Sequence, residues 1–152
     1  MVMGFRAFTD GFAYVVLEGT QSRARVLAKD RLCVPQTRSW PACLAWVRKQ
    51  LAEIVHEYNA EAACIKTIEP VAKKKTPKRL QIEAVILEYW QSERSIDCGT
   101  KVKSQLKRDI VGFTDAARYL DRVLTESKML ADLIAPQYQE AAWAAISELP
   151  EG

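Results

Sequence analysis

The sequence predicts a single α/β domain over residues 1–152, built on a five-stranded mixed sheet. First, three strand-like segments follow one another at the start of the chain. Second, residues 60–108 contain a strand, a basic loop, an apolar helix and another strand, the pattern of a parallel βαβ unit. Third, 49% hydrophobic and 27% charged residues are typical of a globular domain with a buried core. The expected order is β-β-β-α-β-α-β followed by C-terminal helices.

The opening segments predict an antiparallel meander. Residues 2–5 are short and apolar, and residues 11–18 form a clear second strand after a turn at 9–11. A polar loop at 19–22 leads to residues 24–34, which alternate loosely between apolar and polar. Short connections between consecutive strands favour antiparallel neighbours.

Helices and strands alternate after this meander. Ser39 can cap a helix whose first turn tolerates Pro41, and apolar residues then recur at steps of three and four to about residue 59. The remaining elements expected are a strand at 62–70, a helix at 80–90, a strand with a basic tail at 96–108, a helix at 115–125, an apolar segment at 129–135 and a final helix at 137–149. Trp90 and Trp143 lie in apolar helical contexts, which predicts core positions.

Positive charge is concentrated in the middle of the chain. Residues 66–108 contain 11 of the 22 Lys and Arg residues against 5 acidic residues, whereas residues 109–152 are acidic overall. This pattern favours salt-sensitive, sequence-independent binding to the phosphates of DNA or RNA, although a solvated surface loop has the same composition. The candidate nucleic-acid-binding residues are Arg6, Lys66, Lys73, Lys74, Lys75, Lys78, Arg79, Lys101, Lys103, Lys107 and Arg108.

Several classes of protein are disfavoured by the sequence. The chain has no apolar run approaching the roughly 20 residues that span a bilayer, and its start does not resemble a secretory signal, so we expect a cytoplasmic protein without a membrane partner. The four cysteines form no CxxC pair and His56 is the single histidine, which argues against structural zinc and favours buried free thiols. No nucleophile motif supports triad chemistry, and we expect a structural role for His56.

Three groups of residues resemble the RuvC-like (Holliday-junction resolvase-like) branch of the RNase H fold. They are residues 2–5 (VMGF) with 11–18 (GFAYVVLE), residues 68–71 (IEPV) with the following basic linker and helix, and residues 98–108 (CGTKVKSQLKR). A closer likeness, at 65–66, 81–84, 102–108 and 140–143, is to a small uncharacterised bacterial family of RuvC-like domains. The resemblance spans most of the chain and implies an RNase H-like fold.

This resemblance also implies a place for a metal site. RNase H-type nucleases clamp a phosphodiester with two divalent ions, held by carboxylates from the middle of strand one, the end of strand four and the last helix. The strand-one position is Arg6, which cannot ligate a metal. The strand-four position is Glu69 or Lys66, depending on the alignment, and Glu140 matches the last helix. The candidate catalytic and metal-binding residues are therefore Glu69 and Glu140.

The resemblance leaves three functions open. We expect a domain that binds nucleic acid through a basic face and whose nuclease site has degraded, since the basic residues follow strands four and five at the end where this fold holds its substrate. One alternative is a Mg²⁺- or Mn²⁺-dependent endonuclease, in which Asp10 or Glu18 replaces the missing ligand. The other is a protein-interaction module that uses the old cleft or the acidic C-terminal third. RuvC-like proteins often dimerise, so the resemblance is compatible with a homodimer, although no heptad or exposed apolar stripe in the sequence indicates one.

Overall fold

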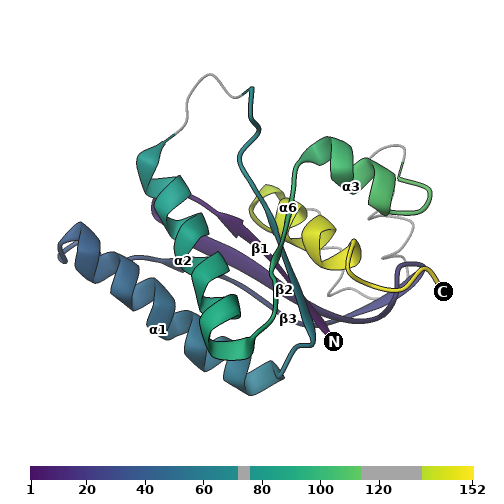
Figure 1. Cartoon of the computed structure of the whole chain (residues 1–152), viewed down its shortest axis with the longest axis horizontal. Coiled ribbons are helices and arrows are strands. Elements are labelled where there is room, and N and C mark those ends of the chain that lie inside the picture. Colours follow the sequence, from purple (N-terminus) through teal and green to yellow (C-terminus); the bar gives the residue numbers. More distant parts are fainter. Residues whose placement is uncertain (72–75, 114–134) are drawn as a thin grey trace.

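A computed structural model describes residues 1–71, 76–113 and 135–152 of the chain (Figure 1). Its strands are β1 (Val2–Ala7), β2 (Gly11–Thr20), β3 (Arg23–Cys33), β4 (Ala62–Lys66) and β5 (Gly99–Lys101). Its helices are α1 (Trp40–Tyr58), α2 (Pro77–Arg94), α3 (Lys103–Asp109) and α6 (Pro136–Ile146). The expected helix at 115–125, nearly all of the segment at 129–135, and Lys73, Lys74 and Lys75 lie outside the described residues.

The strands form one mixed sheet in the order β3-β2-β1-β4-β5. Antiparallel pairing joins β1 to β2 and β2 to β3, whereas β1, β4 and β5 are parallel neighbours. The predicted meander, the two crossovers and the five-stranded mixed sheet are therefore confirmed. Strand β1 lies at the centre, with β3 and β5 at the two edges.

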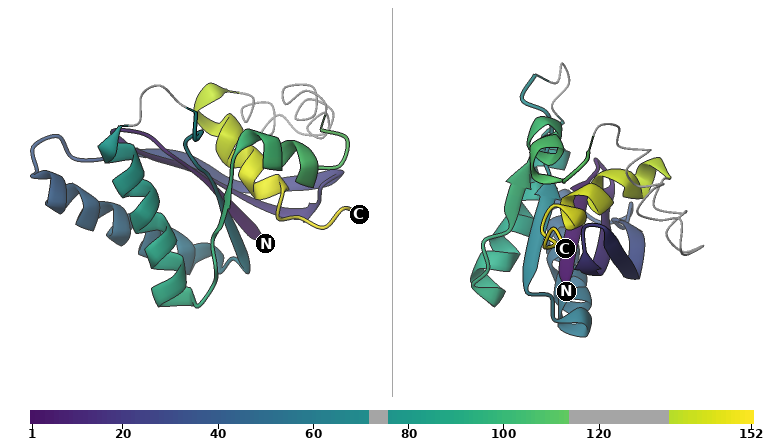
Figure 2. Two further views of the ribbon diagram at one scale, coloured as in Figure 1. Left: turned by 45° about the horizontal axis from the view of Figure 1, so that its top comes forward. Right: turned by 90° about the vertical axis from the view of Figure 1, so that its right-hand side faces the viewer.

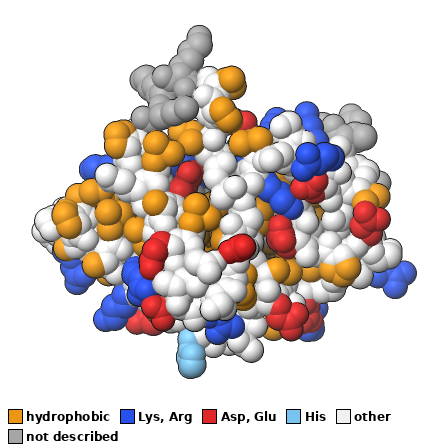
Figure 3. Space-filling view, in the orientation of Figure 1, with side chains coloured by type: hydrophobic (Ala, Val, Ile, Leu, Met, Phe, Trp, Pro, Cys, Tyr) orange, Lys and Arg blue, Asp and Glu red, His pale blue; other side chains and the backbone are white. Residues whose placement is uncertain are grey.

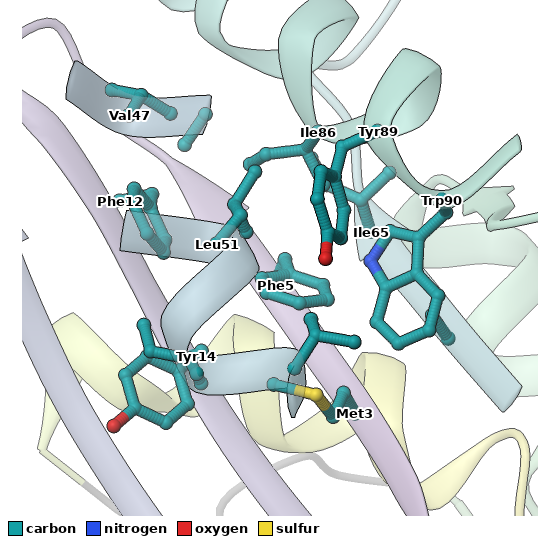
Figure 4. Packing of buried hydrophobic residues seen from close by; sticks show 14 of the residues in the cluster. Met3, Phe5, Phe12, Tyr14, Val47, Leu51, Ile65, Ile86, Tyr89 and Trp90 are labelled. Atoms are coloured by element: carbon teal, nitrogen blue, oxygen red, sulfur yellow. The ribbon is translucent and has the colours of Figure 1, made fainter. Parts of the chain in front are cut away.

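Helices cover both faces of this sheet (Figure 2). Helices α1 and α2 pack on one face over a cluster that includes Phe5, Leu51 and Trp90, whose side chains converge in Figure 4. The rings of Phe5 and Trp90 meet edge to face, with centroids 6.1 Å apart. Helices α3 and α6 pack on the other face, where Trp143 is buried. The core positions predicted for Trp90 and Trp143 are confirmed.

Local chemistry explains where helix α1 begins and ends. The Ser39 side chain accepts a hydrogen bond from the backbone N–H of Ala42 (3.4 Å), as predicted for an N-cap. At the other end, Asn59 adopts the left-handed conformation (φ 48°) and its N–H bonds to the carbonyl of Val55. Asn tolerates this conformation better than most side chains, so the helix stops there.

Helix α6 lies directly against the central strand because Gly4 has no side chain. A Cβ atom at Gly4 would lie 1.9 Å from the carbonyl oxygen of Ala141 and 2.4 Å from the nitrogen of Ala145. The alanines of α6 present a flat surface that allows this approach. This contact fixes the middle and end of α6 over the middle of β1, and the preceding residue Glu140 lies near the carboxyl end of the strand.

Two predicted strands are shorter in the structure. The strand expected at 62–70 ends at Lys66, and the one expected at 96–108 is a strand only over Gly99–Lys101. Helix α3 occupies most of the remainder because Leu106 and Ile110, four residues apart, are both buried, which suits a helix. The side chain of Gln105 also accepts a hydrogen bond from the N–H of Val102 (2.9 Å) and caps the first turn.

Smaller differences concern boundaries and exposure. Helix α2 extends beyond the predicted 80–90 at both ends, and α6 ends three residues before residue 149. Cys43 and Cys64 are buried free thiols as expected, but Cys33 is exposed at the end of edge strand β3. Among the residues described, no helix is both long enough and apolar enough to cross a bilayer.

Candidate functional site

Parallel pairing brings the ends of β1 and β4 together under helix α6. Arg6 and Lys66 lie one residue beyond the paired Phe5 and Ile65. Because side chains alternate along a strand, Arg6 points to the same face as Gly4, where α6 packs. Six charged residues meet at this end of the sheet, and we call them the charge cluster: Arg6, Lys66, Glu69, Arg79, Glu83 and Glu140.

Lys66 is the buried centre of the charge cluster. Its side chain is 4% exposed, and its ammonium group lies 3.0 Å from Glu69 Oε1 and 3.6 Å from Glu140 Oε1. The same ammonium donates a hydrogen bond to the carbonyl of Thr67 (3.0 Å). A buried ammonium needs such partners, because removing a charge from water is costly when it stays unpaired. Lys66 therefore joins a loop carboxylate to a helix carboxylate.

Arg6 holds the other oxygen of Glu140. Its Nε donates to Glu140 Oε2 at 2.5 Å, and both side chains are about a quarter exposed. Glu140 thus accepts from a strand-one guanidinium and faces a strand-four ammonium at once. Glu140, the helix carboxylate that resembles a metal ligand, is therefore paired with two protein cations, Arg6 and Lys66.

A second pair in the charge cluster comes from helix α2. Arg79 and Glu83 are four residues apart on one helical face, and Arg79 Nε lies 3.3 Å from Glu83 Oε1. The same oxygen accepts a hydrogen bond from the N–H of Ile68 (3.1 Å), which ties the loop after β4 to α2. Arg79 Nη2 is buried without a hydrogen-bond partner among the described residues. Sequence reasoning missed Glu83, although its spacing from Arg79 was a usable signal.

Burial and neighbouring charges shift the pKa values of the charge cluster in opposite directions. Burial raises the pKa of Glu69, but the N–H of Lys103 and the ammonium of Lys66 outweigh it and hold this pKa below its usual value. For Glu83 burial dominates, so its pKa is raised despite Arg79. Burial, with the nearby charge of Arg6, lowers the pKa of Arg79. Of Glu69 and Glu83, Glu69 is thus the one that its neighbours stabilise in the charged form.

The charge cluster does not suit a divalent ion. Guanidinium and ammonium groups donate hydrogen bonds and repel a metal, whereas Mg²⁺ requires several oxygen ligands. In the described parts of the chain, no group of three or more His, Cys, Asp or Glu residues is arranged to hold a metal. Asp10 bonds to Arg31 (3.1 Å), and Glu18 lies beyond the Val2–Leu17 pair, at the opposite end of β1 from Arg6.

The other candidate nucleic-acid-binding residues are divided between separate places. Lys78 is exposed, with its ammonium 5.0 Å from the ring centroid of Trp40. Lys101 lies at the end of β5, where Asp109 (3.3 Å) and Glu148 (3.0 Å) neutralise it. The exposed basic residues of α3 are Lys103, Lys107 and Arg108.

Helix α3 connects the charge cluster to the surface. The N–H of Lys103, in its first turn, donates a hydrogen bond to Glu69 Oε1 (3.0 Å). Lys and Arg side chains gather over α3 on the face shown in Figure 3, with carboxylates between them. Asp109, the last residue of α3, pairs with Arg108 (2.8 Å). The predicted basic tail is therefore a short helix anchored at the charge cluster.

Comparisons with known proteins find similar structures. RuvC of Thermus thermophilus, solved in complex with a Holliday junction substrate, superposes with a TM-score of 0.74 at 14% identity, covering 96% of this chain and 90% of RuvC. The Fowlpox virus resolvase, solved with Holliday junction DNA, gives a TM-score of 0.57 at 8% identity, covering 98% of each chain. No family model and no curated protein matches the sequence. The chain therefore has the RNase H-like α/β fold in the form found in RuvC.

Proposed function

We propose that this protein binds DNA or RNA through its basic surfaces and that its nuclease site has degraded. The observation that carries the proposal is the position of the Lys66 ammonium, in contact with both Glu69 and Glu140. These are the two carboxylates that resemble metal ligands. A protein cation replaces the divalent ion that would otherwise join them, so the fold is retained without the metal chemistry.

The positive charge near this end of the sheet supports nucleic-acid binding. Lys78 at the start of α2 and Lys103 and Lys107 on α3 are exposed. Exposed Lys and Arg residues can neutralise the phosphates of a nucleic acid without reading its sequence. The fold neighbours, RuvC and the viral resolvase, were solved with Holliday junction DNA, which makes branched DNA the first ligand to test.

Association measured across a salt series tests the proposal. We expect log K to fall linearly with log[salt], by about 0.9 for each phosphate contacted. Lys103→Ala and Lys107→Ala should each weaken binding and reduce the slope by about one. Lys49→Ala is the matched control, since this residue is exposed on α1 over the opposite face of the sheet. Absent binding at low salt, or affinity indifferent to salt, would contradict the proposal.

A metal-dependent endonuclease is the second candidate. Its support is that Glu69 and Glu140 converge on one point, now occupied by an ammonium. It predicts cleavage of branched DNA with Mg²⁺ or Mn²⁺ that Glu69→Gln abolishes. Cleavage of that kind would overturn the degraded site while leaving nucleic-acid binding intact.

A further inference from the structure

A hollow of about 630 Å³ lies beside the charge cluster, at the carboxyl end of β1. One wall consists of Arg6, Phe8 and Arg31, from β1, its following turn and β3. The other consists of Gln137, Gln139 and Glu140, at the start of α6. Its volume is within the usual range for sites that take small molecules, roughly 300–1,000 Å³.

The first wall is a stack of planar groups. The guanidinium carbon of Arg6 lies 4.1 Å from the ring centroid of Phe8, and that of Arg31 lies 4.0 Å from the same centroid. Both cations therefore contact the same ring, a favourable arrangement for Phe8.

Each guanidinium of this stack is fixed by a carboxylate. Arg6 donates to Glu140 (2.5 Å) and Arg31 donates to Asp10 (3.1 Å). Their charges are thereby largely compensated, and Glu140 itself faces the hollow. The negative charge of this carboxylate would repel a phosphate that entered the hollow. A neutral planar ring would not be repelled, and it could stack on a guanidinium plane.

The second wall supplies hydrogen-bonding groups for such a ring. The amides of Gln137 and Gln139 each carry a donor and an acceptor, as the edges of nucleobases do. Unpaired bases are commonly recognised by stacking on aromatic side chains or Arg planes together with hydrogen bonds to the base edges. We propose that this hollow takes an unpaired nucleobase of the bound nucleic acid. This inference rests on the proposed function and adds a ligand to it.

A pair of matched oligonucleotides tests the inference. The first is a duplex with one unpaired adenine, and the second has an abasic unit at the same position. We expect the wild-type protein to bind the first about tenfold more tightly, as typical of one stacked base. Arg31→Ala and Gln139→Ala should each remove this preference while retaining binding to the abasic duplex. Lys107→Ala is the control, because loss of a phosphate contact should weaken both equally.

Each other outcome contradicts a defined part of the inference. Equal, salt-dependent binding of both duplexes would overturn the nucleobase site and leave the proposed function standing. A preference that survives in both variants would place base recognition elsewhere. If the protein binds free adenosine monophosphate but shows no preference between the duplexes, the ligand of the hollow is a free nucleotide and not a base of a bound strand. Failure to bind any nucleic acid would overturn the inference and the proposed function together.

Discussion

Replacing Gly4 by alanine should destabilise the protein by forcing helix α6 away from the sheet. The added Cβ would lie 1.9 Å from the carbonyl oxygen of Ala141, whereas ordinary contacts begin near 3.4 Å. Helix α6 must therefore move by about 1.5 Å, because the clashing atoms belong to its backbone and cannot rotate away. Overpacking of this kind costs about 1–3 kcal/mol, and the rigidity of the contact favours the upper end.

Urea unfolding followed by circular dichroism measures this loss directly. The matched control is Gly99→Ala, where the new Cβ would meet Glu148 Oε1 at 3.3 Å and Cys64 Sγ at 3.5 Å, contacts that small adjustments relieve. We expect Gly4→Ala to lower the free energy of unfolding by about 2–3 kcal/mol more than the control does. Equal stability of the two variants would refute the close packing of α6 on β1.

Three further predictions concern the charge cluster and the thiols. Lys66→Met should lower the free energy of unfolding in urea by about 1–3 kcal/mol, since it removes charged hydrogen bonds; unchanged stability would mean that the ammonium contributes nothing net. Glu69 binds a proton at higher pH in the unfolded chain than in the folded protein, so the free energy of unfolding should fall as the pH drops below about 4.5. Glu69→Gln should make this fall less steep in acid titrations, and an unchanged slope would contradict the lowered pKa of Glu69. Iodoacetamide should modify the exposed Cys33 in the folded protein, but it should modify Cys64 only after unfolding, because burial raises the pKa of Cys64 to about 12. Peptide mass spectrometry measures the two modification rates, and equal rates in the folded protein would contradict the burial of Cys64.

The sequence predicted the sheet better than the segments after it. Apolar runs joined by short turns identify β1 and β2, which are buried on both faces, and a loose alternation identifies β3 at the edge. The α3 segment was misjudged because its pattern of charge between apolar residues fits a strand as well as a helix. Burial of Leu106 and Ile110 on one side settles the matter, and burial depends on tertiary packing that a sequence does not display.

The candidate site was predicted in part. The resemblance placed Arg6 at the strand-one ligand position and Glu140 at the last-helix ligand position. The structure joins these two side chains directly. Two alignments competed for the end of β4, one through Lys66 and one through Glu69. The structure brings both residues to the same place, three residues apart and in contact. The Arg31–Phe8 contact was not foreseen, because Phe8 lies in the turn after β1 and Arg31 in β3, and no spacing along the chain relates them.

The long edge strand β3 has a consequence for how copies of this protein can meet. An exposed sheet edge invites pairing with another chain, and Lys or Arg side chains along it oppose that pairing. The basic residues of β3 are Arg23, Arg25, Lys29 and Arg31. At the other edge, β5 is three residues long and leads almost at once into α3. Pairing of two copies through their sheet edges, and β-type aggregation with it, is therefore disfavoured at both edges of this sheet.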